Sequence, residues 1–188
     1  EKNGKRDSRH HISHIEVFQE KDISRFNELD VVANFQPLWA IEDEYITEHT
    51  WPKIGQERSK YLYPIGSVKR SGGKIAFGSD WYVTSVNPLD GIETAVTRLE
   101  PNGLTKNPLG VNEEIGLADA IEAYTLNGAY VNFLDKKVGS IEVGKQADLI
   151  VLDKNLFEIL PKEINESRVL ATIFNGDIVF GSYEDLQN

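Results

Sequence analysis

The sequence contains no cysteine and no methionine, and it has no long hydrophobic run. Without cysteine there can be no disulfide, no thiol nucleophile and no cysteine-ligated zinc, so any bound metal must rest on His, Asp or Glu side chains. A membrane-spanning helix needs about 20 consecutive apolar residues, and no such segment occurs. We therefore expect neither a disulfide-based fold nor a membrane partner.

The missing methionine also bears on where the sequence starts. A newly translated protein begins with Met, whereas this chain begins with Glu1, so we expect the first residue to mark a processing site or a cut. Targeting signals would then lie outside these residues. We favour a cytoplasmic location, and export stays open as an alternative.

Positive charge is in short supply as well. The chain has 30 acidic against 20 basic residues, a net charge of -10, and the acidic residues are scattered rather than grouped. Nucleic-acid sites need clustered Lys and Arg, so we expect no nucleic-acid partner. A hydrophobic content of 40% is that of a globular protein with its own core.

Strand-like and helix-like patterns alternate over the first two-thirds of the chain. Period-two or β-branched runs predict strands at residues 11–15, 31–35 and 74–78. Helical spacing and helix-start residues predict helices at residues 21–29, 58–68, 88–99 and 112–126, with Asn87 as the cap of the third. The last helix is expected to bury Leu117, Ala118, Ile121 and Thr125 and to end at Asn127-Gly128. Residues 37–57 are expected to form a long loop, and loops of that length are usually functional. This alternation indicates an α/β fold with a parallel sheet.

The pattern of the sequence changes after Phe133, from alternating strands and helices to short β runs. Short β runs at 149–152, 169–174 and 178–180 are separated by turn residues, and Asn175-Gly176 is a strong hairpin signal. We therefore divide the chain into a first part, residues 1–133, and an antiparallel second part, residues 134–188. Three strand-helix units cannot close a barrel and a few strands cannot complete a sandwich. We expect both parts to need partners, through self-association or a missing N-terminal half of the same protein.

Two side chains at predicted strand ends are the candidates for chemistry. Asp80 follows the third strand and His14 ends the first, and parallel α/β folds place catalytic groups at the carboxyl ends of strands. An imidazole and a carboxylate from neighbouring strand ends are suitable ligands for a zinc-like ion. The alternatives are an ordinary turn or helix cap at Asp80 and a half-buried structural histidine at His14.

Four further residues are candidates for substrate binding. Gln36 and Arg58 are able to orient a polar substrate, although an arginine in this setting more often forms an exposed ion pair. Trp39 and Trp81 flank the same expected pocket mouth. Aromatic rings there line a substrate pocket or belong to the core, and the sequence favours neither explanation.

Several segments, in order along the chain, resemble one enzyme family. They are Ile12-Ser13-His14-Ile15-Glu16, Val32 to Ala40, Tyr63 to Ser67, Ala76 to Trp81, Asn87-Pro88-Leu89, Ala95 to Arg98, Tyr124 to Ala129, and the run from Gly139 to Asp153. The set is similar to the C-terminal portion of amidohydrolase-superfamily enzymes, in the family 3 branch that includes N-substituted formamide deformylase-like proteins.

The resemblance implies a fold and a set of ligands. It implies strands six to eight of a (β/α)₈ TIM barrel with their helices, followed by the C-terminal segment of a small β-sandwich. His14 matches the metal-binding histidine after strand six, and Asp80 matches the aspartate after strand eight that contacts the metal and acts as general base. The family's remaining ligands would lie upstream of Glu1, so this chain would hold only part of the site for a divalent metal, expected to be zinc.

The implied function is hydrolysis of an amide- or formamide-type carbon-nitrogen bond in a small molecule, by metal-activated water with Asp80 as the base. On this reading the isolated chain is an inactive fragment. One alternative is a stable non-catalytic fragment or assembly module. Another is a parent enzyme of the same superfamily that acts as a deaminase or an esterase.

Overall fold

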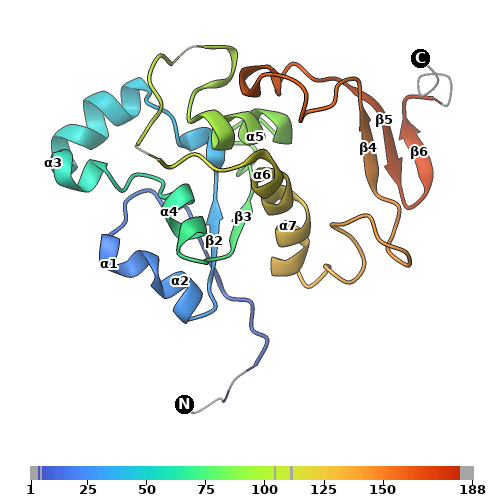
Figure 1. Cartoon of the computed structure of the whole chain (residues 1–188), viewed down its shortest axis with the longest axis horizontal. Helices are drawn as coiled ribbons and strands as arrows, with labels where there is room; N and C mark the ends of the chain where they lie inside the picture. Colours follow the sequence, from blue (N-terminus) through green and yellow to red (C-terminus); the bar gives the residue numbers. More distant parts are fainter. Residues whose placement is uncertain (1–3, 5, 104, 111, 183–188) are drawn as a thin grey trace.

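The computed structural model of the chain describes residues 4, 6–103, 105–110 and 112–182. In this part of the chain there are two sheets of three strands each, a parallel sheet of order β1-β2-β3 and an antiparallel sheet of order β4-β5-β6. Figure 1 shows helices α5, α6 and α7 between the two sheets. The predicted α/β class is confirmed.

The parallel sheet and its helices come from the first two-thirds of the chain. The strands are β1 (His11–Ser13), β2 (Val32–Phe35) and β3 (Ile75–Phe77). The helices are α1 (Glu20–Ile23), α2 (Arg25–Glu28), α3 (Trp51–Ser59), α4 (Ile65–Arg70), α5 (Pro88–Thr97), α6 (Leu117–Tyr124) and α7 (Leu126–Val131). Two 3-10 turns, η1 (Pro37–Trp39) and η3 (Pro101–Gly103), and one π-helix, η2 (Tyr45–Thr50), complete this part.

Alternate residues of β2 and β3 build the core. Ala33 is in register with Ile75 and Phe35 with Phe77, and all four side chains are buried. They join a single hydrophobic cluster with residues of α4, α5 and α6, including Ile65, Val68, Leu89, Ile92 and Ala120. Burying a residue of the size of Phe or Ile stabilises the fold by about 1.5–3 kcal/mol, so the strand positions are firmly fixed.

Helix α5 begins and ends as its sequence indicates. The side chain of Asn87 accepts a hydrogen bond from the backbone N–H of Leu89 at 3.2 Å, which confirms the predicted cap. Arg98 ends the helix in the left-handed region, with φ 58°. Its fully buried guanidinium donates to the carbonyls of Leu109 at 2.8 Å and Leu62 at 3.2 Å, and burial lowers the pKa of Arg98 to about 10.

Two predictions between the second and third strands are wrong. Residues 58–68 are not one helix, because α3 ends at Ser59 and α4 begins only at Ile65. Pro64 explains the break, since a proline disfavours helical geometry in the residue before it, and Tyr63 has φ 45°. The expected loop at 37–57 instead contains η1, η2 and most of α3.

The helix expected from Asn112 also differs. It begins at Leu117, because the Glu113 carboxylate is used elsewhere: it accepts the N–H of Ser67 at 2.8 Å in the first turn of α4. The backbone there passes so close to Gly66 that a Cβ would lie 2.8 Å from the Asn112 carbonyl oxygen. The predicted stop at Asn127-Gly128 is wrong too, since those residues lie inside α7.

The predicted buried face of α6 is right for Leu117 and Ile121, which pack against the core, and wrong for the other two residues. Ala120 and Ala123 are buried, whereas Ala118 and Thr125 are exposed. The reason is the later start of the helix and the irregular backbone at Thr125, with φ -108° and ψ -87°, which separates α6 from α7. The predicted single helix at residues 112–126 is therefore replaced by α6 and the start of α7.

The C-terminal sheet consists of β4 (Leu149–Leu152), β5 (Val169–Phe174) and β6 (Asp177–Phe180). A 3-10 turn, η4 (Pro161–Glu163), lies between β4 and β5 in the sequence. Asn175 and Gly176 have φ 51° and 91°, as a two-residue hairpin turn requires, so this prediction is confirmed. Glu93 of α5 is buried and accepts the backbone N–H of Asn165 at 2.9 Å, which ties this region to α5.

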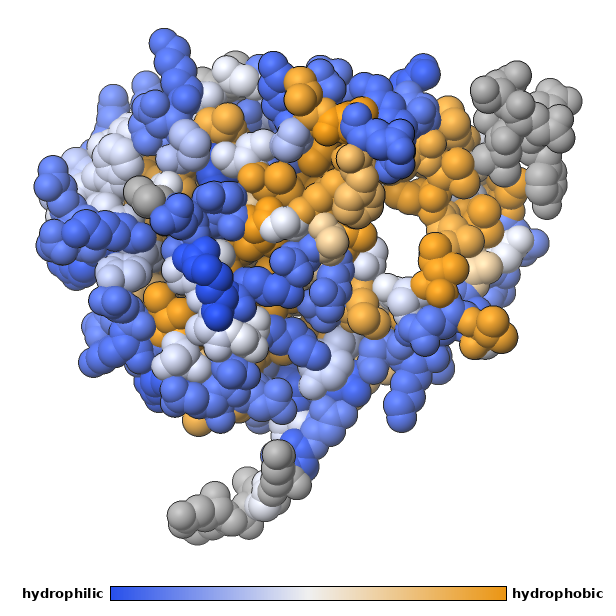
Figure 2. All heavy atoms as spheres, viewed as in Figure 1, coloured by the Kyte–Doolittle hydropathy of each residue, from blue (hydrophilic) through white to orange (hydrophobic). Residues whose placement is uncertain are grey.

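One face of the C-terminal sheet is open and apolar. Ile150 and Phe180 are both in register with Thr172, and Phe174 shares their face. These three apolar side chains are 49%, 58% and 64% exposed. Figure 2 shows hydrophobic atoms gathered over this region of the molecule. Among the described residues, no helix has the length and apolar character that crossing a bilayer demands.

Candidate metal and catalytic site

His14 and Asp80 meet at the carboxyl edge of the parallel sheet. His14 follows β1 and Asp80 lies just beyond β3, and their side-chain atoms Nδ1 and Oδ2 are 4.0 Å apart. The two side chains are 50% and 39% exposed, so an ion or substrate can reach them. The prediction that they follow neighbouring strands is wrong, because β2 lies between β1 and β3. The pair spans the end of β2.

Backbone geometry sends both side chains to this edge. His14 has φ 59° and Asp80 has φ 53°, which is the left-handed region. His and Asp enter that region more readily than most residues, but it still costs energy that the surroundings must offset. Short turns follow directly, since Glu16 N–H donates to the His14 carbonyl at 3.0 Å and Val83 N–H to that of Asp80 at 2.7 Å.

Two residues that follow β2, Gln36 and Trp39, hold His14 in place. The buried Gln36 accepts the backbone N–H of His14 at its Oε1, at 3.2 Å. Trp39 in η1 stacks on the imidazole of His14, with ring centroids 5.1 Å apart and planes 19° from parallel. Stacking of this kind contributes about 0.5–1.5 kcal/mol beyond buried area. Two residues singled out from sequence therefore touch His14 directly.

Trp81 and Arg58 are placed differently. Trp81 follows Asp80 in sequence, is 67% exposed, and donates its backbone N–H to Ser79 Oγ at 3.2 Å. Arg58 lies at the exposed end of α3 and donates its Nε to the Ile54 carbonyl at 3.0 Å. The structure thus leaves Trp81 beside the pair and does not bring Arg58 to it.

Asn34 is a polar residue of this region that the sequence analysis missed. It sits in β2, in register with Ser13 and Ala76, and its Nδ2 donates to Ser13 Oγ at 3.1 Å. Its Oδ1 is buried and has no hydrogen-bond partner among the described residues. The available signal was a polar side chain within an otherwise apolar strand, which is unusual unless it has a use.

The pair fits part of a metal site. Zinc lies about 2.0–2.2 Å from imidazole nitrogen and carboxylate oxygen, so two ligands of one ion are separated by about 4 Å or less. The observed 4.0 Å separation of His14 Nδ1 and Asp80 Oδ2 is at the upper end of that range. No group of three or more His, Asp or Glu side chains that could hold an ion occurs within the described ranges. The chain therefore presents two donors of the right chemistry.

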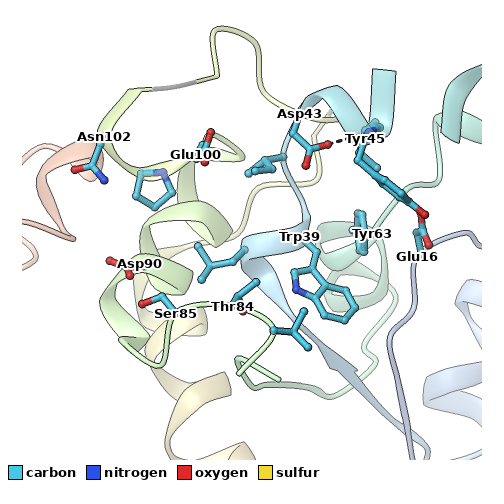
Figure 3. Close-up of a pocket in the computed structure, with 15 residues that line it drawn as sticks. Glu16, Trp39, Asp43, Tyr45, Tyr63, Thr84, Ser85, Asp90, Glu100 and Asn102 are labelled. Atoms are coloured by element: carbon cyan, nitrogen blue, oxygen red, sulfur yellow. Dashed lines mark hydrogen bonds between the residues drawn. The ribbon is translucent and has the colours of Figure 1, made fainter. Parts of the chain in front are cut away.

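The structure contains a cavity of about 740 Å³, whose lining residues are drawn in Figure 3. Trp39, which stacks on His14, forms part of its wall, and so do Val83, Thr84 and Ser85 from the segment after Asp80. The cavity is large enough for a small organic molecule. His14 and Asp80 do not line the cavity themselves, and Trp39 is the residue that both lines it and contacts His14.

Comparison with known proteins identifies the family. The sequence model of the amidohydrolase family matches residues 1–180, so this chain belongs to that family. It is 35% identical over 175 residues to Protein LONG AFTER FAR-RED 3 of Arabidopsis thaliana, covering 93% of this chain and 29% of that protein. It is 32% identical over 126 residues to N-substituted formamide deformylase of Arthrobacter pascens, covering 67% and 22%.

A solved structure gives the same architecture. An adenosine deaminase from Xanthomonas campestris with bound zinc matches with a TM-score of 0.63 at 20% identity, over 91% of this chain and 37% of that one. The likeness shows the fold. The chain spans less than a third of the length of the two curated relatives named above.

Proposed function

We propose that this chain forms part of the active site of a metal-dependent hydrolase that cleaves carbon-nitrogen bonds of the amide or formamide type. The single observation that carries this proposal is the 4.0 Å approach of the His14 imidazole to the Asp80 carboxylate at the carboxyl edge of a parallel sheet. Family membership and the relative named as a formamide deformylase support the reaction class.

The architecture proposed for the complete protein follows the family. Strands β1, β2 and β3 would be strands six to eight of a (β/α)₈ barrel, within a unit comprising residues 1–133. Residues 134–188 would supply a segment of a small β-sandwich. Their three antiparallel strands and open apolar face support this assignment, since such a face is normally covered.

The metal proposed is a divalent ion, most simply zinc. Imidazole with carboxylate is a donor set that suits zinc, and the similar adenosine deaminase structure contains zinc. Tight binding normally takes three or more protein ligands. His14 and Asp80 would supply two, and we propose that the others come from parts of the complete protein outside these 188 residues.

The residues of this chain would act as follows. A bound divalent cation supplies Lewis acidity, which polarises a carbonyl and makes water a stronger acid near neutral pH. Asp80 would accept a proton from the attacking water and deliver it to the departing nitrogen. Gln36 would hold the His14 backbone so that its ring stays directed at the shared space. Trp39 would fix the imidazole by stacking and shape the substrate cavity.

Trp81 is proposed as an aromatic contact for substrate at the exposed edge of the site, because it directly follows Asp80 and is largely accessible. Arg58 was a candidate for the same task. Its position on α3 and its bond to the Ile54 carbonyl give that role no support.

A deaminase is the second candidate. The observation in its favour is the likeness to a zinc-containing adenosine deaminase. The two reactions share metal-activated water and differ in the departing group, which is an organic amine for cleavage of an N-substituted amide or formamide and ammonia for deamination.

The test is a product assay on the complete protein. Zinc-loaded enzyme would be offered N-substituted formamides, N-substituted amides, adenosine-type amines and esters, with release of amine, ammonia and alcohol measured separately. We expect amine release that a chelator abolishes and zinc restores. Ammonia release alone would favour the deaminase. Amine release that is indifferent to chelation, or no product from any class, would overturn the proposal.

A further inference from the structure

The cavity that Trp39 lines has a one-sided charge. Its described lining residues include four carboxylates and no Lys, Arg or His. The acidic side chains belong to Glu16, Asp43, Asp90 and Glu100, and they come from four separate segments of the chain, as Figure 3 shows. A cleft lined by charge of one sign concentrates ions of the opposite sign. The cavity is therefore built to attract a cation.

Aromatic rings make up a second part of the wall. Trp39, Tyr45 and Tyr63 lie together on one side of the cavity in Figure 3. The faces of such rings attract cations, with an energy that rises when the site is shielded from water. Aromatic faces combined with carboxylates favour an organic cation over a strongly hydrated inorganic one.

Tyr63 places a polar group in the cavity wall. The residue is only 5% exposed and lines the cavity, and its hydroxyl is not one of the fully buried unpaired polar atoms of the described residues. Burial raises the pKa of Tyr63, and the nearby charges of Glu16 and Asp43 raise it further. The phenol therefore stays neutral, with a lone pair available to accept a hydrogen bond from a ligand N–H.

We propose that this cavity binds a positively charged amine, so that the substrate of the enzyme, or the amine it releases, carries an ammonium group. The inference rests on the proposed function for its link to catalysis, and the cavity's charge and aromatic wall carry the binding part. An ammonium group would donate to a carboxylate and to the Tyr63 hydroxyl while lying against a ring.

The spacing of the acidic groups argues against a metal ion as the occupant. No three acidic or imidazole side chains within the described part of the chain are close enough to share an ion. A volume of about 740 Å³ also exceeds what a single ion fills. A molecule that spans the cavity can meet carboxylates on opposite walls, which one small ion cannot.

The experiment measures binding without catalysis. The complete protein, without added metal, is titrated with benzylammonium and with neutral benzyl alcohol of similar shape, and the dissociation constants are taken from calorimetry. The variants are Tyr63→Phe and the pair Glu16→Gln with Glu100→Gln, which keep the side-chain shapes. Glu158→Gln removes an equal charge from an exposed position that is not among the residues lining the cavity and serves as the control.

Wild type and the Glu158→Gln control should prefer the ammonium probe by about five- to tenfold. The double variant should lose most of that preference, and Tyr63→Phe should lose part of it. Equal affinity for the two probes, or an unchanged preference in a folded double variant, would overturn the inference. Because no metal or turnover is involved, failure of the hydrolase proposal would appear separately, in the product assay.

Discussion

The imidazole of His14 and the carboxylate of Asp80 approach to 4.0 Å across the end of a strand that belongs to neither of them. Strands in a sheet are about 4.8 Å apart, so β1 and β3 are separated by roughly twice that distance and only the side chains close the gap. The left-handed backbone at both residues contributes to this approach. The resulting separation is the one on which the proposed shared metal ion depends.

Gln36 should matter through His14 rather than by itself. Gln36→Leu removes the side-chain oxygen that accepts the His14 backbone N–H. Leaving such a donor without its partner costs about 1–3 kcal/mol. We expect a lower free energy of unfolding in urea and weaker zinc binding by the complete protein.

Gln36→Glu keeps an acceptor oxygen at the same place and is the matched control. It should recover most of the zinc affinity lost in Gln36→Leu. Equal zinc affinity in wild type and Gln36→Leu would show that the bond does not position the ligand.

Glu93 should make the attachment of the C-terminal region dependent on pH. Burial raises the pKa of Glu93 above its usual value of 4.5, and the backbone N–H groups of Asn165 and Ile164 only partly oppose that rise. The folded state therefore binds this proton more readily than the unfolded state. The resulting stabilisation is complete below the unfolded pKa and is lost as pH rises through the folded pKa.

Glu93→Gln keeps the acceptor and removes the ionisation. We expect it to be at least as stable as wild type at pH 7 and to lack this part of the pH dependence between pH 4 and 7 in urea unfolding. Glu93→Ala should lose about 1–3 kcal/mol at both pH values, because Asn165 N–H loses its acceptor. The difference in unfolding free energy between pH 4 and pH 7 is the quantity to compare. An equal difference in Glu93→Gln and wild type would contradict this account.

The open face of the C-terminal sheet should drive association of the isolated chain. Phe174 and Phe180 are 64% and 58% exposed on the face they share with Ile150. Replacing both phenylalanines by Lys should shift the mass measured by light scattering toward the monomer without loss of folded structure. Leu29→Lys, at a residue that is 60% exposed in another part of the chain, is the control. A monomeric wild type at high concentration would contradict the prediction.

Sequence reasoning worked best where a local pattern and the tertiary structure agree. The strands, the Asn87 cap and the Asn175-Gly176 turn depend on neighbouring residues. The helix expected from Asn112 failed because Glu113 caps α4, a partner 46 residues away that no local pattern reveals.

The candidate site divides in the same manner. His14 and Asp80 were predictable because they follow recognisable strands. Gln36 and Trp39 were identified as residues near the site, but their bond and their stacking to His14 are visible only in three dimensions. The acidic cavity wall was not predictable, since its carboxylates come from segments spread along the chain.

Turnover by the Asp80→Asn variant of the complete, zinc-loaded protein tests the central claim most directly. Asparagine keeps the size of the side chain but cannot take a proton from water, and general-base catalysis is worth about 10²–10⁴-fold in rate. We predict a loss of kcat of at least that order with the fold intact by circular dichroism. A kcat within twofold of wild type would show that Asp80 is not the base.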